Sequence, residues 1–357
     1  MAAWLTGLVW LALTNNPVAL QSMDLAWVPP PSAGVRVPAM ARVATDRGLV
    51  RKPWCSFGRH AQRTSSAANG PDVLFRRLSP EVRSALSEIH EAILNPSDYS
   101  ARATAEARFA KLVQTVDGPA LIRTTLMDTD ARVQLMALKA AQLIVARQPR
   151  LAAFATGYLG AGDPQLSMAA LDLHFASGCD TAAQYALDGF RHPDEGVQLT
   201  TLRLVYAYSR DHENLRLADR IGEFVAQGKG TPRARVVALR ILGRLGVSAT
   251  TSYVEALLND KQDAVAAEAL ATLAILQPGA AEKLLGKWLK DKSPLKRAGA
   301  LRAFAQVHAS RRDLAEKVLR PMLNEATPVV DVYGVGAAPG RTLGEVAHAA
   351  LDYIEMP

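Results

Sequence analysis

From about residue 80 onward, an Ala-Leu or Thr-Leu pair recurs inside segments in which apolar residues repeat every three or four positions. The first six pairs are Ala137-Leu138, Ala170-Leu171, Thr201-Leu202, Ala238-Leu239, Ala269-Leu270 and Ala300-Leu301, at steps of 33, 31, 37, 31 and 31 residues. A seventh pair, Ala350-Leu351, follows after 50 residues, which is one period plus about 19 inserted residues. Apolar residues at this spacing predict an amphipathic helix around each pair.

Turn signals open most of these segments. The stretches "GDPQ" (162–165), "HPDE" (192–195), "GTPR" (230–233) and "KSPL" (292–295) place a proline at the predicted helix start, where its missing N–H costs nothing. Thr231 and Ser293 stand immediately before their prolines, and we expect them to be N-caps.

Shorter helical stretches lie between the pair-bearing segments, at 119–127, 150–159, 180–190, 212–227, 250–259, 279–290 and 311–323. The unit is therefore two antiparallel helices per roughly 31 residues. One such unit cannot bury its apolar face, but stacked units form a continuous core. The pattern predicts an all-α fold, an α-solenoid over 78–357. The β-branched, glycine-rich stretch 327–340 is predicted to be an insertion loop or short hairpin.

The recurring pattern of a short helix, Asp-Pro, and then V-x-x-x-A-L-x-x-L resembles the HEAT-repeat family, especially the short bacterial HEAT-like repeats of about 31 residues. The resemblance covers about 120–325 well, and 80–119 and 340–354 less well. It implies a curved solenoid whose second helices line the concave face and bind partners there.

The first 77 residues have a different character. Residues 1–22 contain an uncharged apolar run that is too short to span a bilayer, and no transmembrane segment is predicted. This run has the length of a signal-peptide core but no preceding Lys or Arg, so a cytoplasmic location is favoured over export. The remainder of 1–77 lacks periodicity and is rich in Pro, Ser, Ala and Arg, which predicts a disordered leader.

The net charge of +7 is unevenly distributed along the chain. It is +6 over 1–80, −4 over 81–224, +9 over 225–320 and −4 over 321–357. Basic side chains recur at one repeat position on the predicted second helices, and on the helix from 232 three arginines share one stripe. The predicted partner-binding residues are Lys139, Arg203, Arg233, Arg240, Arg244 and Arg302. The alternative to a binding role is a solvated face with ordinary ion pairs.

Motifs for chemistry are weak. Gly228-Lys229 is followed by Gly230 rather than Ser or Thr, so the stretch does not match a phosphate-binding loop. Cys55 and Cys179 are too few for a disulfide framework or a four-ligand zinc site. The histidines lack metal-ligand spacing, and the His-Glu pairs at 90–91 and 212–213 are expected to be structural. We predict no catalytic residue, metal or cofactor.

The sequence therefore predicts a non-enzymatic scaffold or adaptor that binds a protein partner through the concave helix face. A second hypothesis is binding of nucleic acid or another polyanion through the basic stripe of 225–320. A third is an enzyme of the HEAT-like lyase or DNA glycosylase type, for which Trp288 and Asp291 are a faint candidate site. The identity of the partner and the oligomeric state do not follow from these patterns.

Overall fold

The computed structural model describes residues 78–95, 98–115, 118–178, 182–211, 215–330 and 342–355. All regular elements in these ranges are helices, and the fold is an all-α helical repeat solenoid, as the periodicity predicts. No helix in the described ranges is long and apolar enough to cross a membrane. The leader 1–77, with the signal-like segment 1–22, lies outside the described residues.

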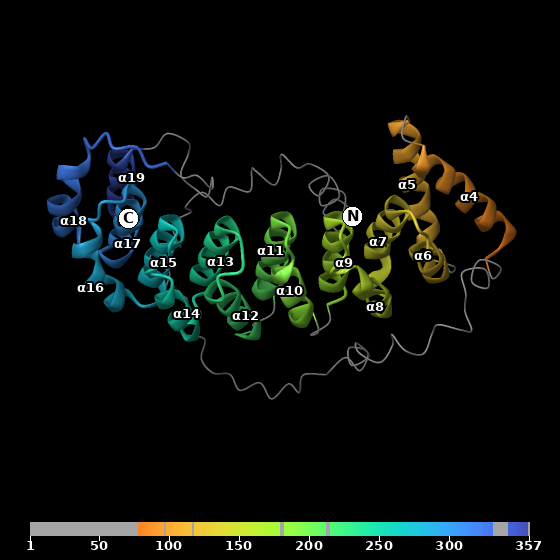
Figure 1. Ribbon diagram of the computed structural model, residues 1–357, viewed down its shortest axis with the longest axis horizontal. Coiled ribbons are helices and arrows are strands. Elements are labelled where there is room, and N and C mark those ends of the chain that lie inside the picture. The colour runs from red at the N-terminus through yellow and green to blue at the C-terminus, as the bar shows by residue number, and fades with distance from the viewer. Residues whose placement is uncertain are drawn as a thin grey trace. The chain divides into compact units, whose positions relative to one another are not determined.

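The described chain divides into two compact units at Gly230–Thr231. This boundary falls within the longest regular step of the repeat, the 37 residues between Leu202 and Leu239. In each unit the helices alternate between a first and a second helix along the chain, and successive second helices lie side by side (Figure 1).

The first unit contains α4 (Pro80–Leu94), α5 (Tyr99–Val113), α6 (Gly118–Leu126), α7 (Ala131–Val145), α8 (Ala152–Ala155), α9 (Pro164–Ala176), α10 (Ala182–Arg191), α11 (Glu195–Asp211) and α12 (Leu215–Ala226). Short 3-10 turns, Pro149–Leu151 and Thr156–Tyr158, extend α8 on both sides. Its second helices are α5, α7, α9 and α11.

The second unit contains α13 (Pro232–Leu245), α14 (Thr251–Ala256), α15 (Asp263–Leu276), α16 (Pro278–Trp288), α17 (Pro294–Val307), α18 (Arg312–Leu319) and α19 (Leu343–Glu355). The 3-10 turns Ser248–Thr250 and Arg320–Met322 adjoin α14 and α18. Its second helices are α13, α15, α17 and α19.

All seven Ala-Leu or Thr-Leu pairs lie in second helices, from α7 to α19. Both members of the first six pairs are completely buried, because they face the neighbouring second helices and the first helices beneath them. In the last pair Ala350 is buried but Leu351 is only half-buried. The prediction of paired helices at these positions is confirmed.

In the described part of the chain, a similar turn precedes four of the second helices, α7, α11, α15 and α17. The first turn residue accepts a hydrogen bond from the backbone N–H two positions later, with Asp128, Asp260 and Asp291 as acceptors at 2.8–2.9 Å. His192 does the same through Nδ1, at 3.1 Å from the Asp194 nitrogen. An aspartate or imidazole acceptor at this point reverses the chain and leaves the next polar residue in the N-cap position.

Side-chain N-caps open several of the second helices. Thr231 accepts from the Ala234 nitrogen at 3.2 Å and Ser293 from the Lys296 nitrogen at 3.4 Å, which confirms both predicted caps. Prolines occupy the first helical position of α9, α13 and α17, as predicted. Pro193 is an exception, because α11 begins at Glu195 with the proline outside it. The prediction that Pro193 lies inside the helix start was wrong, because Asp194 takes the capping role and bonds the Val197 nitrogen at 3.0 Å.

The predicted insertion loop 327–340 lies mostly outside the described residues. Only its first four residues, 327–330, are described. Pro328 and Thr342 form an isolated antiparallel bridge, and the Leu343 nitrogen donates to the Thr327 carbonyl at 2.9 Å. The ends of the insertion therefore meet at the start of α19.

Glycines permit the closest helix approaches. A Cβ on Gly299 of α17 would lie 2.6 Å from the carbonyl oxygen of Ala267 in α15. In the first unit, a Cβ on Gly189 of α10 would lie 2.1 Å from Oγ1 of Thr201. Gly189 therefore makes room for the threonine that stands at an alanine position of the repeat.

We expect Gly299→Ala to lower the free energy of unfolding by roughly 2 kcal/mol, because the new methyl would meet backbone atoms that cannot move aside. Gly286→Ala in α16 is the matched control. No atom lies within 4 Å of the Cβ it would add, so this change should raise stability by up to about 1 kcal/mol. Urea denaturation followed by circular dichroism measures both, and equal stability of the two variants would show that α15 and α17 can separate freely.

Candidate functional site

An open hollow lies on the second-helix side of the first unit, with a volume of about 550 Å³. It is lined by Arg102 of α5, by Ala131, Arg132 and Leu135 of α7, by Asp163, Pro164, Gln165 and Met168 at the start of α9, and by Asp194, the N-cap of α11. Four successive second helices or their caps thus contribute to one surface depression.

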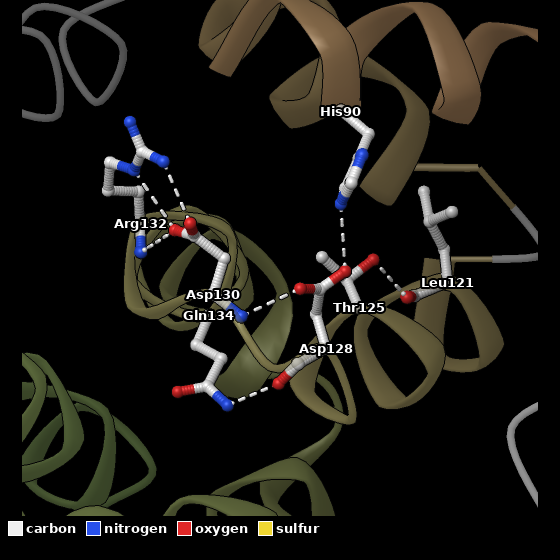
Figure 2. Close-up of polar contacts among 7 residues, drawn as sticks. All are labelled: His90, Leu121, Thr125, Asp128, Asp130, Arg132 and Gln134. Carbon is white, nitrogen blue, oxygen red and sulfur yellow. Dashed lines mark hydrogen bonds and ion pairs between the residues drawn. The ribbon is translucent and has the colours of Figure 1, made fainter. Parts of the chain in front are cut away.

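Arg132 lines the hollow from the start of α7 and contacts the turn that precedes this helix (Figure 2). The Asp130 carboxylate caps α7 by accepting from the Arg132 nitrogen at 2.8 Å, and it also pairs with the Arg132 guanidinium at 2.8 Å. This guanidinium hydrogen-bonds the carboxylate and lowers the pKa of Asp130 to about 2. Arg132 also reaches the Leu94 carbonyl at 3.3 Å, so the rim is tied to the end of α4.

Asp128 is the centre of the same turn. Its Oδ1 accepts from the Asp130 nitrogen, its Oδ2 lies 3.0 Å from Nε2 of His90 in α4, and its carbonyl accepts from the Gln134 side chain (Figure 2). His90 therefore has a structural contact, because its imidazole lies beside the carboxylate of the turn that precedes α7. No group of three His, Cys, Asp or Glu side chains suited to a metal occurs among the described residues. The second His-Glu pair, at 212–213, lies outside them.

The hydrogen bond from the Gln134 side chain to the turn carbonyl has counterparts in the next two repeats. The residue four positions before the pair leucine bonds the carbonyl six residues earlier, from Gln134 to Asp128, from Ser167 to Ala161 and from Gln198 to His192. The turns at the edge of the hollow are therefore fixed by side chains of the helices that follow them. A rigid rim of this kind favours binding with little ordering cost.

The hollow combines both signs of charge with apolar surface. Arg102 and Arg132 offer guanidinium donors, whereas Asp163 and Asp194 offer carboxylate acceptors. Leu135 and Met168 supply apolar contact area, and methionine adapts its shape to different occupants. Chemically, this arrangement can hold a polar segment by charge pairing, hydrogen bonds and a short apolar contact.

The second unit carries a different cluster. Glu268 of α15 lies between Arg240 of α13 and Arg302 of α17, with N–O distances of 3.0 and 2.8 Å. Its side chain is only 5% exposed. Burial alone would raise the pKa of Glu268, but the charges and hydrogen bonds of the two arginines lower it to about 2. One buried carboxylate thus connects three successive second helices.

A related pair occurs in the first unit. Arg203 of α11 lies 3.2 Å from Asp172 of α9, and both residues directly follow a pair leucine. Burial raises the pKa of Asp172 to about 6, and the charge of Arg203 offsets only part of this effect. The repeat position that the sequence analysis singled out as basic is therefore used here for an ion pair between neighbouring helices.

The six predicted contact residues have distinct environments. Arg203, Arg240 and Arg302 take part in ion pairs that bridge helices, which gives them a structural role. Lys139 and Arg244 are exposed, and Arg233 is half-buried in the first turn of α13. Lys139 and Arg203 belong to the first unit and the other four to the second. A partner-binding role for these residues remains a prediction.

Sequence reasoning did not anticipate the role of Glu268. A signal did exist, because Ala271 interrupts the basic repeat position between Arg240 and Arg302, and an acidic residue stands one helical turn before it. The hollow had no such signal, since its lining residues come from turns whose spatial overlap depends on helix packing.

Comparisons with known proteins add little. No protein-family model matches the chain, and no curated protein sequence matches it. Among solved structures, the chain is similar to one described as an engineered protein, at 14% sequence identity and a TM-score of 0.25, covering 80% of this chain and 71% of that one. A similarity at this TM-score supports no conclusion about fold or function.

We expect Glu268→Gln to lower the free energy of unfolding by roughly 3–5 kcal/mol at neutral pH, because two arginines would then face each other without a carboxylate. The folded-state pKa of about 2 lies below the ordinary 4.5, so this stabilisation is present above pH 4.5 and is lost as the pH falls towards 2. Chemical denaturation across this range measures both effects. Glu282→Gln, at a side chain that is 58% exposed, is the control and should change stability little. A Glu268→Gln protein as stable as this control at pH 7 would contradict a stabilising triad.

Asp172 should produce the opposite pH dependence. Its folded-state pKa of about 6 lies above the ordinary 3.8, so the folded state binds a proton more tightly and its stability falls as the pH rises from 4 to 6. We expect Asp172→Asn to remove this fall, which amounts to roughly 2 kcal/mol. Unfolding free energies measured for both proteins from pH 4 to 7 test this, and parallel profiles would show that Asp172 titrates normally.

Proposed function

We propose that this protein is a non-enzymatic scaffold that binds a protein partner through the second-helix side of its repeats, with the hollow of the first unit as the anchor site. The observation that carries the proposal is the hollow itself, a depression of about 550 Å³ to which α5, α7, α9 and the cap of α11 contribute. Its volume lies in the range of ordinary ligand-binding pockets.

The lining chemistry suits an extended segment of a partner chain. A carboxylate of the segment would pair with Arg102 or Arg132, and a basic side chain with Asp163 or Asp194. An apolar side chain between them would contact Met168. Binding of this kind requires neither a metal nor a cofactor.

The resemblance to HEAT repeats also favours a partner-binding site on the second-helix side, because that family commonly binds partners along its second helices. Exposed apolar side chains also recur there at one repeat position. Leu143 of α7 is 41% exposed and Ile275 of α15 is 37% exposed, each five residues after a pair leucine. Exposed apolar groups on second helices provide contact area for a partner.

We expect Gln165→Arg combined with Met168→Glu to weaken partner binding at least tenfold, because the two changes place new charges in the floor and rim of the hollow. Affinity purification of the full chain from its source cells, followed by mass spectrometry, identifies the partner. Calorimetric titration of the purified partner then gives the dissociation constants of the wild type and the variant.

Gln148→Arg is the matched control, because Gln148 is exposed after α7 and does not line the hollow. It should leave the dissociation constant unchanged. Equal affinities of the wild type, the hollow variant and this control would refute the hollow as the anchor site. Arg240→Glu is unsuitable as a test of binding, since it would disrupt the triad around Glu268.

A further inference from the structure

The lysines of this chain are concentrated in one short segment. Eleven lysines occur among 41 basic residues, and five of the eleven lie between 283 and 296. Four of these, Lys283, Lys287, Lys290 and Lys292, are exposed, and we name them the lysine face. Lys283, Lys287 and Lys290 stand at i, i+4 and i+7, so they project from one side of α16 and its C-terminal turn.

The opposite side of α16 holds the segment in place. Ala281, Leu285 and Trp288 are buried against the rest of the second unit. The fifth lysine, Lys296 of α17, pairs with Asp263 at 3.2 Å, and its ammonium group lies 5.9 Å from the centre of the Trp288 ring. The lysine face is therefore displayed by a helix that is anchored by its own core contacts.

The four ammonium groups of the lysine face are exposed in the part of the chain that the structure describes. In the described residues no carboxylate forms an ion pair with these four lysines. Asp291 lies between them in sequence, but its Oδ1 accepts from the Ser293 nitrogen at 2.9 Å. The next first helix, α18, is charge-balanced, with Arg312 and Lys317 against Asp313 and Glu316, and its Glu316 is shared between Arg312 and Arg320 of the following turn at 3.3 and 3.1 Å. α16 and α18 lie on the same side of α17 (Figure 1).

We infer that the lysine face binds the phosphate backbone of a double-stranded nucleic acid without reading its sequence. Lysine ammonium groups act as point charges towards phosphate oxygens, and a duplex presents phosphates at a density that four neighbouring lysines can engage together. Lys283 and Lys287 lie one helical turn apart on α16, about 6 Å along its axis, and Lys290 and Lys292 follow directly after the helix. The site is independent of the hollow, since it lies in the other unit.

The surroundings favour a duplex over other polyanions. The large exposed apolar side chains of the described residues are Tyr99, Met127, Leu143, Phe154, Ile275 and Val330, and none belongs to α16 or α18. A membrane-binding face would need apolar groups that enter the bilayer, and a protein interface would need an apolar centre. Trp288 is 6% exposed and cannot stack on the bases of a single strand.

The test is fluorescence anisotropy of the full chain with labelled 20-base-pair duplexes of DNA and of RNA, at increasing salt. If each lysine neutralises one phosphate, the logarithm of the association constant should fall with the logarithm of salt concentration at a slope of at least about −3.6. Replacing all four lysines by glutamine should weaken binding at 50 mM salt at least tenfold and reduce the magnitude of the slope by about 3.6.

The control removes four exposed cations elsewhere, as Lys111→Gln, Arg147→Gln, Lys229→Gln and Lys261→Gln, so that both variants carry the same net charge. It should retain most of the affinity. Equal loss in the two variants, or no binding by the wild type at 50 mM salt, overturns the inference. Tighter binding to phosphatidylserine vesicles, to polyglutamate or to single strands than to either duplex also overturns it. Circular dichroism verifies that both variants are folded.

Discussion

Close packing between successive second helices is the constraint on which the rest of this structure depends. An isolated helix pair exposes its apolar face, and the repeat buries that face only when neighbouring second helices approach closely. Alanine or threonine before each pair leucine, completely buried in six of seven repeats, keeps this approach close. Where even a methyl group is too large the chain uses glycine, as at Gly299 against Ala267. The threonine at 201 is accommodated by a glycine on the facing helix, which shows that volume is balanced across the contact.

The turns serve the same packing. The pairs align only if each second helix begins at the right residue. Before α7, α11, α15 and α17, an acceptor side chain two residues ahead of the N-cap helps to fix this start. Aspartate fills this role in several turns and His192 in another, through different atoms but with the same backbone donor position. The glutamines and the serine that bond the turn carbonyls then fix the turn to its own helix. Polar groups at the helix ends are thus satisfied locally, while the apolar face remains available to the neighbours.

Much of this fold was predictable because its determinants are local. Helical spacing, the recurring pair and the caps at Thr231 and Ser293 all act within a few residues of each other. The position of Pro193 was not predictable in this way, because a proline is compatible both with the first helical residue and with the residue before the N-cap. The ion pairs of Glu268 and Asp172 could not be assigned from spacing, since partners about 30 residues apart meet only after the helices have stacked. The hollow depends on the same stacking, and it involves residues from four second helices or their caps.

Arginine and lysine side chains occupy different environments in this structure. Among the described residues, Arg203, Arg240 and Arg302 form ion pairs between neighbouring second helices, and Arg235 and Arg297 pair with carboxylates in adjoining loops. A guanidinium is weakly hydrated and can donate to two carboxylate oxygens, so it tolerates burial between helices. A lysine ammonium is strongly hydrated and remains at the surface unless a partner holds it, as Asp263 holds Lys296. The basic residues of 225–320 therefore include arginines that join one second helix to the next, Arg240 and Arg302, and exposed lysines of α16 and the turn after it. The four lysines of the lysine face form no ion pair in the described residues, so their charges stay accessible to solvent and to a polyanion.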